Sequence, residues 1–515
     1  MVNEFKNEPF TDFSKPENRK AFEAALEKIR GEFDRESPLV IGGKEVKTND
    51  KIRSINPADK NQVVHTSQKA GADMVEPAIA AAQAAFETWR YTPAEERAGF
   101  CFKAAKIMRE RKHEFSAMMV WETSKNWAEA DGDTAEAIDF LEFYGREAIR
   151  YGQKQEVTPY PGEEPSLSWI PLGVGAVIPP WNFPLAILVG MASAAFVSGN
   201  TVILKPSSDA TGTGWKFAQL MQEVGLPDGV LNFCPGAGAT FGDKLVQHPQ
   251  TRFITFTGSK EVGLRIVEQA AISRPGQIWI KRVVAEMGGK DTIVVAGDGD
   301  LDAAAEGITA AAFGYQGQKC SACSRAIVDE KVYDTVVQKV IEHTKKLTVG
   351  QPDEYGTYMG AVINKAAFDS ISEYIEIGKK EGELVCGGET MSDKGFHIQP
   401  TIFSNIHEDA RISLEEIFGP VLAFIKCKDY EDGLRIANNT EYGLTGAVYS
   451  RSEENLALAR ERFHVGNLYL NRKCTGALVG VHPFGGFNMS GTDSKAGGRH
   501  YLAQFSQLKS VSRKI

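Results

Sequence analysis

The sequence lacks the features that mark secreted, membrane-spanning and nucleic-acid-binding proteins. Its seven cysteines are scattered and odd in number, so we expect no disulfide framework and a reducing compartment. The most apolar run, residues 184–197, is too short to cross a bilayer, and the polar N-terminus has no apolar segment typical of a secretory signal. A net charge of −9 gives no support to nucleic-acid binding. We therefore expect a cytoplasmic protein with no membrane or nucleic-acid partner.

Metal binding also has little support in the sequence. Cys320 and Cys323 form a C-x-x-C pair, but no second C-x-x-C or C-x-x-H occurs, and a zinc site needs another ligand pair. We therefore predict no metal. What the chain does have is an ordinary globular composition, with 42% hydrophobic and 24% charged residues. Its 515 residues are enough for two or three domains.

Short runs rich in β-branched residues alternate with helical patterns between residues 173 and 289. This alternation predicts a doubly wound parallel α/β sheet of the Rossmann type, in which ligands bind outside the carboxyl ends of the strands. A second alternating region, from residue 292 to about 470, predicts another α/β domain. The predicted strands are 174–178, 201–205, 230–234, 252–257 and 283–286 in the first region, and 292–295, 325–328, 421–424 and 446–449 in the second.

Cys320 is the most prominent candidate for chemistry. It follows a run of small residues that predicts a helix, and Gly314 and Gly317 loosen the chain before it, which we interpret as room for ligands beside one thiol. Glu286 follows a short apolar run, so a thiol and a carboxylate each stand at the end of an element. This pair suggests covalent catalysis followed by hydrolysis. Cys323 leads into a predicted strand and better fits a buried structural thiol.

Segments at the ends of the predicted strands carry further candidates, each with a plainer alternative. Asn182 offers an amide that can stabilise an oxyanion, or it is a helix N-cap. Lys205 suits ribose hydroxyls, or it is a solvated surface charge. The turn 258–263 aims backbone N–H groups at a phosphate, or serves only the passage from strand to helix. Residues 415–420 offer a carboxylate and an aromatic ring to a nucleoside, or form a capped helix end.

Together these motifs are more specific than any one of them. Their order and spacing resemble those of the aldehyde dehydrogenase superfamily from about residue 40 to the C-terminus. They are Pro180-Trp181-Asn182-Phe183, Phe256-Thr257-Gly258-Ser259 with Gly263, Glu286-Met287-Gly288-Gly289, Gly317-Gln318-Lys319-Cys320 and Glu416-Ile417-Phe418-Gly419-Pro420. Residues 281–291, 318–325, 475–486 and 490–498 resemble, more narrowly, the 1-pyrroline-5-carboxylate (L-glutamate γ-semialdehyde) dehydrogenases. The chain length leaves no room for the extra domain of the bifunctional proline-catabolic enzymes, so the resemblance is to the free-standing bacterial form.

This resemblance implies NAD-dependent oxidation of L-glutamate γ-semialdehyde to L-glutamate, in proline and arginine catabolism. Cys320 would form a thiohemiacetal and then a thioester, Asn182 would hold the oxyanion, and Glu286 would activate the hydrolytic water. The residues implied for the substrate are Phe183, Ser321, Gly476, Ala477 and Phe484. Those implied for the cofactor are Ile178, Pro180, Trp181, Lys205, Ser208, Gly238, Gly242, Phe256, Gly258, Ser259, Val262, Gly288, Glu416 and Phe418.

One departure from the family pattern concerns the cofactor. Many NAD-preferring members have a glutamate three positions after the strand-end lysine, and this chain has Ser208. The lost charge would no longer repel a 2′-phosphate, so we expect NADP to be tolerated beside NAD. Alternative functions are oxidation of another semialdehyde, CoA acylation, and a catalytically silent binding protein on the same scaffold. Glu286 argues against CoA acylation, and the set of Cys320, Glu286 and Asn182 argues against a silent protein.

The resemblance also guides the predicted domain organisation. Alanine-rich amphipathic stretches from residue 74 to 150 predict a helical layer beside a sheet. Residues 153–170 are an extended excursion, either an oligomerisation arm or an exposed loop, and the strand-like stretch 503–511 is a plausible partner for it. We expect at least a homodimer, or an assembly of dimers. The predicted parts are 1–152, the N-terminal and helical part of the cofactor domain; 153–170 with 483–515, the arm; 171–289, the NAD-binding domain; and 290–482, the catalytic domain.

Overall fold

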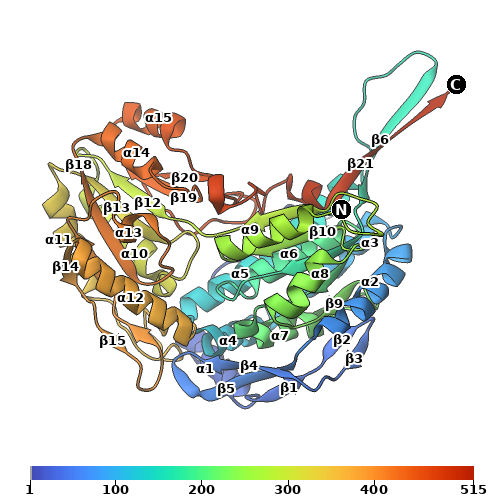
Figure 1. The fold of residues 1–515 in the computed structure, drawn as a ribbon, viewed down its shortest axis with the longest axis horizontal. Coiled ribbons are helices and arrows are strands. Elements are labelled where there is room, and N and C mark those ends of the chain that lie inside the picture. The colour runs from blue at the N-terminus through green and yellow to red at the C-terminus, as the bar shows by residue number, and fades with distance from the viewer. Residues whose placement is uncertain (1–2) are drawn as a thin grey trace.

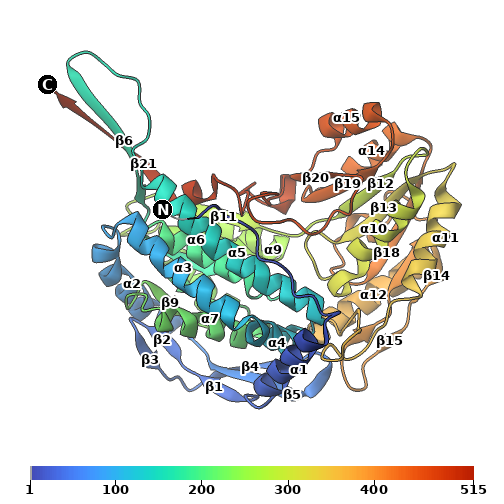
Figure 2. The ribbon, with the colours of Figure 1, turned by 180° about the vertical axis from the view of Figure 1, so that it is seen from behind.

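Two seven-stranded sheets, one in each half of the molecule, organise the fold, and a two-stranded ribbon projects from one end (Figure 1). The computed structural model describes residues 3–515. Seen from behind, the long helices of the N-terminal half lie side by side across one face of the first sheet (Figure 2). In the described part of the chain, no helix has both the length and the apolar character needed to span a membrane.

The first sheet has the strand order β11-β10-β7-β8-β9-β2-β3. The five strands from β11 to β9 are parallel, which confirms the predicted doubly wound sheet, and β2 and β3 extend it with antiparallel pairs. The strands are β2 (Leu39–Ile41), β3 (Lys44–Val46), β7 (Val174–Ile178), β8 (Thr201–Leu204), β9 (Leu231–Phe233), β10 (Phe253–Thr257) and β11 (Arg282–Glu286).

Alternate residues of these strands face two different cores, because side chains of a strand point to opposite faces in turn. Val177 packs in the core that contains helix α6, whereas its neighbours Ala176 and Ile178 pack in the core that contains helices α2 and α9. Helix α6 is apolar all round and almost wholly buried, as expected for a helix enclosed by other layers. The helices around this sheet are α2 (Val75–Trp89), α3 (Ala94–Glu110), α4 (Lys112–Thr123), α5 (Trp127–Tyr151), α6 (Ala186–Val197), α7 (Thr211–Glu223), α8 (Asp243–Gln247) and α9 (Lys260–Ala271).

The second sheet has the order β14-β17-β18-β13-β12-β19-β20, and all its pairs except β14–β17 are parallel. It confirms the second α/β region and its four predicted strands, to which the structure adds three more. The strands are β12 (Asp291–Val295), β13 (Cys323–Asp329), β14 (Glu383–Cys386), β17 (Thr401–Ser404), β18 (Val421–Cys427), β19 (Thr445–Tyr449) and β20 (Asn467–Leu470). The helices are α10 (Leu301–Phe313), α11 (Tyr333–Thr344), α12 (Lys365–Glu381), α13 (Arg411–Leu414), α14 (Tyr430–Asn438) and α15 (Glu453–Arg462).

The projecting ribbon consists of β6 (Glu163–Pro171) and β21 (Ser506–Lys514), which pair antiparallel along their whole length. This confirms the predicted pairing of the excursion with the tail, although the tail strand begins at residue 506. Leu508 and Val511 of β21 remain about half exposed. Near the N-terminus, helix α1 (Pro16–Arg30) packs on α4, and a small sheet joins β1 (Arg35–Ser37), β5 (Asp59–Gln68) and β4 (Lys51–Asn56). The pair β15 (Thr390–Met391) and β16 (His397–Ile398) completes the strands.

A single buried carboxylate ties three of these elements together. Glu122, near the end of α4, is fully buried and accepts hydrogen bonds from the N–H groups of Gly212 (2.7 Å) and Thr213 (2.8 Å) at the start of α7. It also accepts from the hydroxyls of Thr213 (2.7 Å) and of Ser54 in β4 (2.6 Å). A carboxylate at this place satisfies donors of the first helical turn that have no partner within the helix.

We predict that Glu122→Ala lowers the thermal unfolding midpoint substantially, because it leaves several buried donors without an acceptor, at roughly 1–3 kcal/mol for each unsatisfied group. The matched control is Glu110→Ala on the exposed end of α3, which should change stability by less than about 0.5 kcal/mol. Differential scanning calorimetry of both variants is the measurement. Equal midpoints for the two variants would contradict this account of Glu122.

Candidate functional site

A groove opens at the carboxyl ends of the first sheet's strands, where doubly wound folds bind ligands. Its volume is about 520 Å³. All fourteen residues that the sequence pointed to for the cofactor line this groove: Ile178, Pro180, Trp181, Lys205, Ser208, Gly238, Gly242, Phe256, Gly258, Ser259, Val262, Gly288, Glu416 and Phe418.

One end of the groove offers groups that suit phosphate and ribose. Helix α9 begins directly after Ser259, whose side chain caps it by accepting from the N–H of Val262, so the positive end of the helix faces the groove. Lys205 is buried, not a solvated surface charge, and its Nζ donates to the carbonyls of Pro206 (3.3 Å) and Gly236 (3.2 Å). Burial lowers the pKa of Lys205 to about 8.

A carboxylate also reaches the groove from the other half of the molecule. Glu416 accepts from the N–H of Gly289 (3.0 Å), and burial raises its pKa to about 7. Gly288 must be glycine for this contact, because a Cβ there would lie 1.9 Å from the Glu416 carboxylate. The ring of Phe418 packs edge-on against Trp181, with centroids 5.5 Å apart. The two halves of the chain therefore close one groove between them.

Cys320 lies in a loop, residues 314–322, that joins α10 to β13 and that we call the thiol loop. Tyr315, Gln316 and Gly317 all have left-handed backbone angles, with φ of 51°, 58° and 66°. Two consecutive non-glycine residues in this region are unusual, and such strain persists only where surrounding contacts enforce it. At Gly317, a Cβ would lie 2.3 Å from the carbonyl oxygen of Gly419. This glycine therefore permits close backbone packing, which corrects its interpretation as room for a ligand.

The contacts that enforce the loop come from the end of helix α4. The hydroxyl of Tyr315 donates to the carbonyl of Thr123 (3.1 Å), and the amide of Gln316 donates to the carbonyls of Ser124 (3.0 Å) and Ala361 (2.8 Å). Ser124 itself is left-handed, with φ of 57°, and ends the helix. The first half of the molecule thus holds the loop that carries the thiol of the second half.

Lys125 reinforces the same junction. It is fully buried, and its Nζ lies 4.0 Å from the ring centroid of Phe183 and 3.8 Å from that of Tyr315. Its charge partner is Asp133 on α5, at 3.5 Å, and Asp133 also accepts from the N–H of Ala186 at the start of α6 (2.6 Å). Burial lowers the pKa of Lys125 and raises that of Asp133 to about 6. A cation between two aromatic faces links the Asn182–Phe183 turn to the thiol loop.

Asn182 lies next to the thiol loop. It is buried, and its amide Nδ2 donates to the backbone carbonyl of Gln318 (3.1 Å). Helix α6 begins only at Ala186 and has no side-chain cap, so Asn182 does not act as its N-cap. Because an amide carries two N–H donors, this bond leaves the second one for another acceptor.

Glu286 ends strand β11 and is held by the loop that follows Phe484. Its carboxylate accepts from the hydroxyl (2.5 Å) and N–H (3.3 Å) of Ser494 and from the N–H of Gly486 (3.3 Å). Burial raises the pKa of Glu286 to about 7, against the opposing effect of these hydrogen bonds. Residues of the C-terminal tail that we grouped with the arm thus lie against this carboxylate, and only β21 belongs to the ribbon.

Cys320 is partly exposed and borders two cavities, the groove and a larger chamber of about 920 Å³. Burial, with the nearby carboxylates of Asp291, Glu416 and Glu286, raises the pKa of its thiol. Glu286 lines the chamber together with the five residues that the sequence pointed to for the substrate. These are Phe183, Ser321, Gly476, Ala477 and Phe484.

Several charged residues of the chamber were not found by sequence reasoning. Burial raises the pKa of Glu136 on α5 to about 8, and Lys319, beside the thiol, pairs with Glu129 of the same helix at 2.6 Å. The sequence predicts only amphipathic helical stretches over residues 74–150. The available signal was a set of acidic residues spaced three and four apart, which places Glu129, Asp133 and Glu136 on one helical face.

Cys323 lies outside both cavities. It is 1% exposed, and its thiol donates to the carbonyl of Arg325 (3.4 Å) at the start of the strand interior. A third thiol, Cys474, is also fully buried and donates to the carbonyl of Ser321 (3.4 Å). These environments agree with the interpretation of Cys323 as structural and leave Cys320 as the one cysteine among those described that borders the cavities.

Comparison with known proteins extends these observations. The family model described as the aldehyde dehydrogenase family matches residues 45–511. Over 512 residues the chain is 58% identical to the 1-pyrroline-5-carboxylate dehydrogenase of Geobacillus thermodenitrificans, covering 99% of each chain. It is 56% identical over 515 residues, the whole of both chains, to the enzyme of that name from Bacillus cytotoxicus. A crystal structure of the Thermus 1-pyrroline-5-carboxylate dehydrogenase with bound NAD matches all of both chains, with a TM-score of 0.98 and 49% identity.

The matched region contains both sheets, the groove and the chamber, and the relatives match the chain over essentially its full length. The chain belongs to the aldehyde dehydrogenase family.

Proposed function

We propose that the chain oxidises L-glutamate γ-semialdehyde, the open form of 1-pyrroline-5-carboxylate, to L-glutamate with NAD as the hydride acceptor. The observation that carries the proposal is the position of Cys320, where the groove and the chamber meet. One thiol can then serve a dinucleotide on one side and an aldehyde on the other. The names of the full-length relatives agree with this substrate.

The groove fits a dinucleotide by the chemistry of its lining. The N-terminus of α9 suits the pyrophosphate, and Lys205 and Glu416 present a cation and a carboxylate to the hydroxyls of the two riboses. A Cβ at Gly238 would meet no atom within 4 Å, so the groove is open on that side. When bound, NAD supplies the acceptor for the hydride that leaves the substrate carbon.

Cys320 is the proposed nucleophile. Transfer of its thiol proton to solvent water gives the thiolate, which forms a bond to the aldehyde carbon and leaves an oxyanion in a thiohemiacetal. The second N–H of Asn182 and the backbone N–H of Cys320 are the proposed donors to that oxyanion. Departure of hydride then converts the thiohemiacetal to a thioester on Cys320.

Glu286 is the proposed base for the hydrolytic half of the reaction. With a pKa raised to about 7, it is partly ionised near neutrality and can take a proton from water. The resulting hydroxide adds to the thioester, and the C–S bond breaks to release the carboxylic acid and the Cys320 thiolate. A buried base that serves water argues for hydrolysis over transfer of the acyl group to another thiol.

The far end of the chamber is proposed to recognise the amino acid group of the substrate. Gly476 has a left-handed φ of 81°, and backbone N–H groups around such a glycine form a concave site for a carboxylate. The Ser321 hydroxyl adds a donor beside the thiol. Phe183 and Phe484 would flank the aliphatic chain between the two ends.

The remaining expectations are also proposals. We infer that the protein acts in the cytoplasm, and that the ribbon of β6 and β21 pairs with a second copy to form at least a homodimer. The half-exposed Leu508 and Val511 on that ribbon support the second inference. The bounds 1–152, 171–289 and 290–482, and the arm 153–170 with β21 as its partner, are likewise proposed functional parts.

We predict that Cys320→Ala lowers kcat below about one thousandth of the wild-type value, because it removes the nucleophile, while NAD binding changes little. Cys323→Ala is the matched variant three residues away. It should keep most of the activity and lose some thermal stability, since it deletes only a buried sulfur. Steady-state rates and NAD titration by fluorescence test both. Loss of turnover in folded Cys323→Ala would contradict the division between the two thiols.

We predict that Glu286→Gln separates the two halves of the reaction. Acylation should still release one equivalent of NADH in a pre-steady-state burst, whereas turnover should fall by about 10²–10⁴-fold, as for loss of a general base. In the wild type, kcat should decline as pH falls below about 7, because the carboxylate that acts as the base becomes protonated. A variant with neither burst nor turnover would show that Glu286 is needed before hydrolysis.

We predict that NADP is used with lower kcat/KM than NAD, and that Ser208→Glu reduces NADP use by a further factor of about 10 or more, with little effect on NAD. Ser208 is exposed at the groove and leaves space without a negative charge. Asp209, beside it, also lines the groove, and we expect its carboxylate to disfavour a 2′-phosphate and so keep NADP use below that of NAD. Undetectable NADP activity in an enzyme that uses NAD efficiently would refute the expected tolerance.

A further inference from the structure

The segment before helix α1 lies along the rest of the molecule without forming a helix or strand. Residues 5–13, which we call the strap, run over helix α5 toward α1 (Figure 2). Side chains of the strap and of α5 and α3 hold it in place, so its position is specified in spite of its irregular backbone.

Two buried carboxylates of α5 anchor the strap. Asp139 accepts from the Asn7 side chain (2.7 Å) and from the N–H of Glu8 (2.6 Å). Earlier in the same helix, Asp131 accepts from the N–H (2.7 Å) and hydroxyl (2.5 Å) of Thr11. Both carboxylates are less than 5% exposed, and hydrogen bonds to buried charged groups are among the stronger ones.

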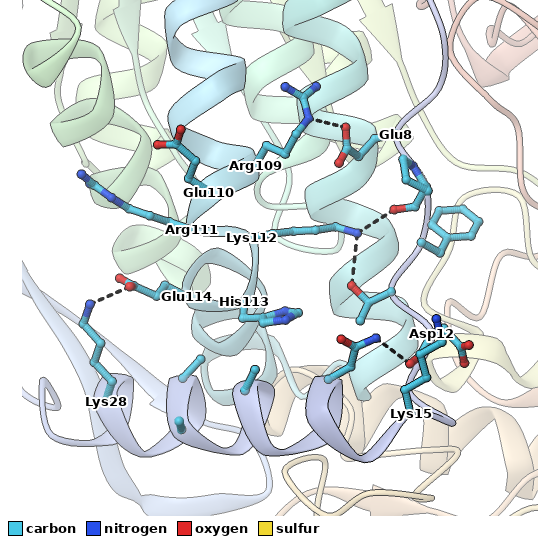
Figure 3. A pocket seen from close by; sticks show the side chains of 17 residues that line it. Glu8, Asp12, Lys15, Lys28, Arg109, Glu110, Arg111, Lys112, His113 and Glu114 are labelled. Atoms are coloured by element: carbon cyan, nitrogen blue, oxygen red, sulfur yellow. Dashed lines mark hydrogen bonds and ion pairs between the residues drawn. The ribbon is translucent and has the colours of Figure 1, made fainter.

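Two cations from the end of α3 and the start of α4 add to this anchorage, as the close-up in Figure 3 shows. Lys112 donates to the carbonyl of Pro9 (3.0 Å). It also forms an ion pair with Asp131 (2.9 Å), which the close-up does not draw. Arg109 pairs with Glu8 at 2.7 Å. The strap is therefore fixed at Glu8, Pro9 and Thr11, directly after a residue that reaches beyond α5.

That residue is Asn7. Its amide Nδ2 donates to Asp139 and also, at 3.0 Å, to the backbone carbonyl of Val479. Val479 follows Gly476 and Ala477 in the loop 475–480, which forms no helix or strand of its own. Asn7 thus connects a buried carboxylate of α5 to a loop that lines the chamber.

Other contacts also hold this loop, since Val479 is buried in the core and the N–H of Leu478 donates to the His482 ring (3.2 Å). Arg472 donates to the carbonyls of Thr475 (2.8 Å) and Gly476 (3.1 Å) at one end, and the N–H of Gly480 donates to Gly497 (2.8 Å) at the other. Phe5 packs under Gly480, where a Cβ would approach its ring to 3.1 Å. Strap residues therefore support the end of the loop that is farther from Arg472.

We propose that the strap determines substrate specificity: Asn7, held by Asp139, positions the loop 475–480 so that its backbone N–H groups receive the α-carboxylate of the substrate. This inference rests on the proposed function, because it takes Gly476 and Ala477 as the carboxylate site. Asn7 is a positioning residue that touches neither the thiol nor the cofactor groove. Its effect should appear only with substrates that bear the carboxylate.

The test compares two aldehydes in wild type and variants: L-glutamate γ-semialdehyde, and butanal, which has neither carboxylate nor amine. For Asn7→Ala we expect KM for the semialdehyde to rise about 3- to 10-fold, with a parallel rise in the inhibition constant of L-glutamate, as for loss of the one part-buried hydrogen bond that Asn7 donates to the loop. Both kcat values and KM for butanal should stay within about twofold of wild type. Lys6→Ala, an exposed neighbour on the same chain segment, is the matched control and should behave as wild type.

Asn7→Asp is a second variant that tests the same role with almost unchanged side-chain size. It replaces the amide donor by an acceptor that faces Asp139 and the Val479 carbonyl. It should reproduce the effect of Asn7→Ala. The role of the strap alone is overturned by either of two results in an enzyme whose wild type prefers the semialdehyde. In the first, both Asn7 variants keep that preference unchanged, and in the second, both lose activity equally toward the two aldehydes. A wild type with no preference for the carboxylate-bearing aldehyde overturns the proposed function, and this inference with it.

Discussion

The hydrogen bonds that the thiol loop donates to the end of α4 are the constraint on which the site depends. Two adjacent non-glycine residues, Tyr315 and Gln316, adopt left-handed angles that cost energy. They keep them because Thr123 and Ser124, nearly two hundred residues earlier in the chain, accept their hydrogen bonds. Lys125 then places its ammonium between the rings of Tyr315 and Phe183. The thiol of one half is in this way fixed relative to the Asn182–Phe183 turn of the other.

Burial of ionisable groups is the second general feature of the site. Glu286, Glu416, Glu136 and Lys205 all have pKa values shifted toward neutrality, and burial is the largest cause in each case. Such groups gain or lose protons readily near pH 7, which suits a reaction that moves protons from a thiol and a water. Enclosing the groove and chamber between the two sheets therefore shifts the pKa values of these groups as well as holding them in place.

Sequence reasoning identified the strands and the groove well, because the signals are local. The run of β-branched residues at 174–178 indicates strand β7, and the glycine turn at 258–263 indicates the start of helix α9, each within a few positions. It recognised a strand-like run at residues 38–43, which contains β2, but assigned it to no sheet, and it found neither β3 nor the charged face of α5. An antiparallel edge strand has no local sign of its partner, and acidic residues in an amphipathic helix ordinarily face solvent.

By itself the sequence determined the fold class and the family to which the thiol and carboxylate motifs belong. It made the tail a plausible partner for the excursion, and the structure decided that they pair. Only the tertiary structure decided that Lys125 is buried between two rings and that Gly317 serves backbone packing. The tertiary structure decided as well that the loop 483–498 donates hydrogen bonds to Glu286. It also decided that Asn7 reaches the loop 475–480. These contacts join residues hundreds of positions apart, and their energies come from burial and mutual hydrogen bonding, which no local pattern of residues encodes.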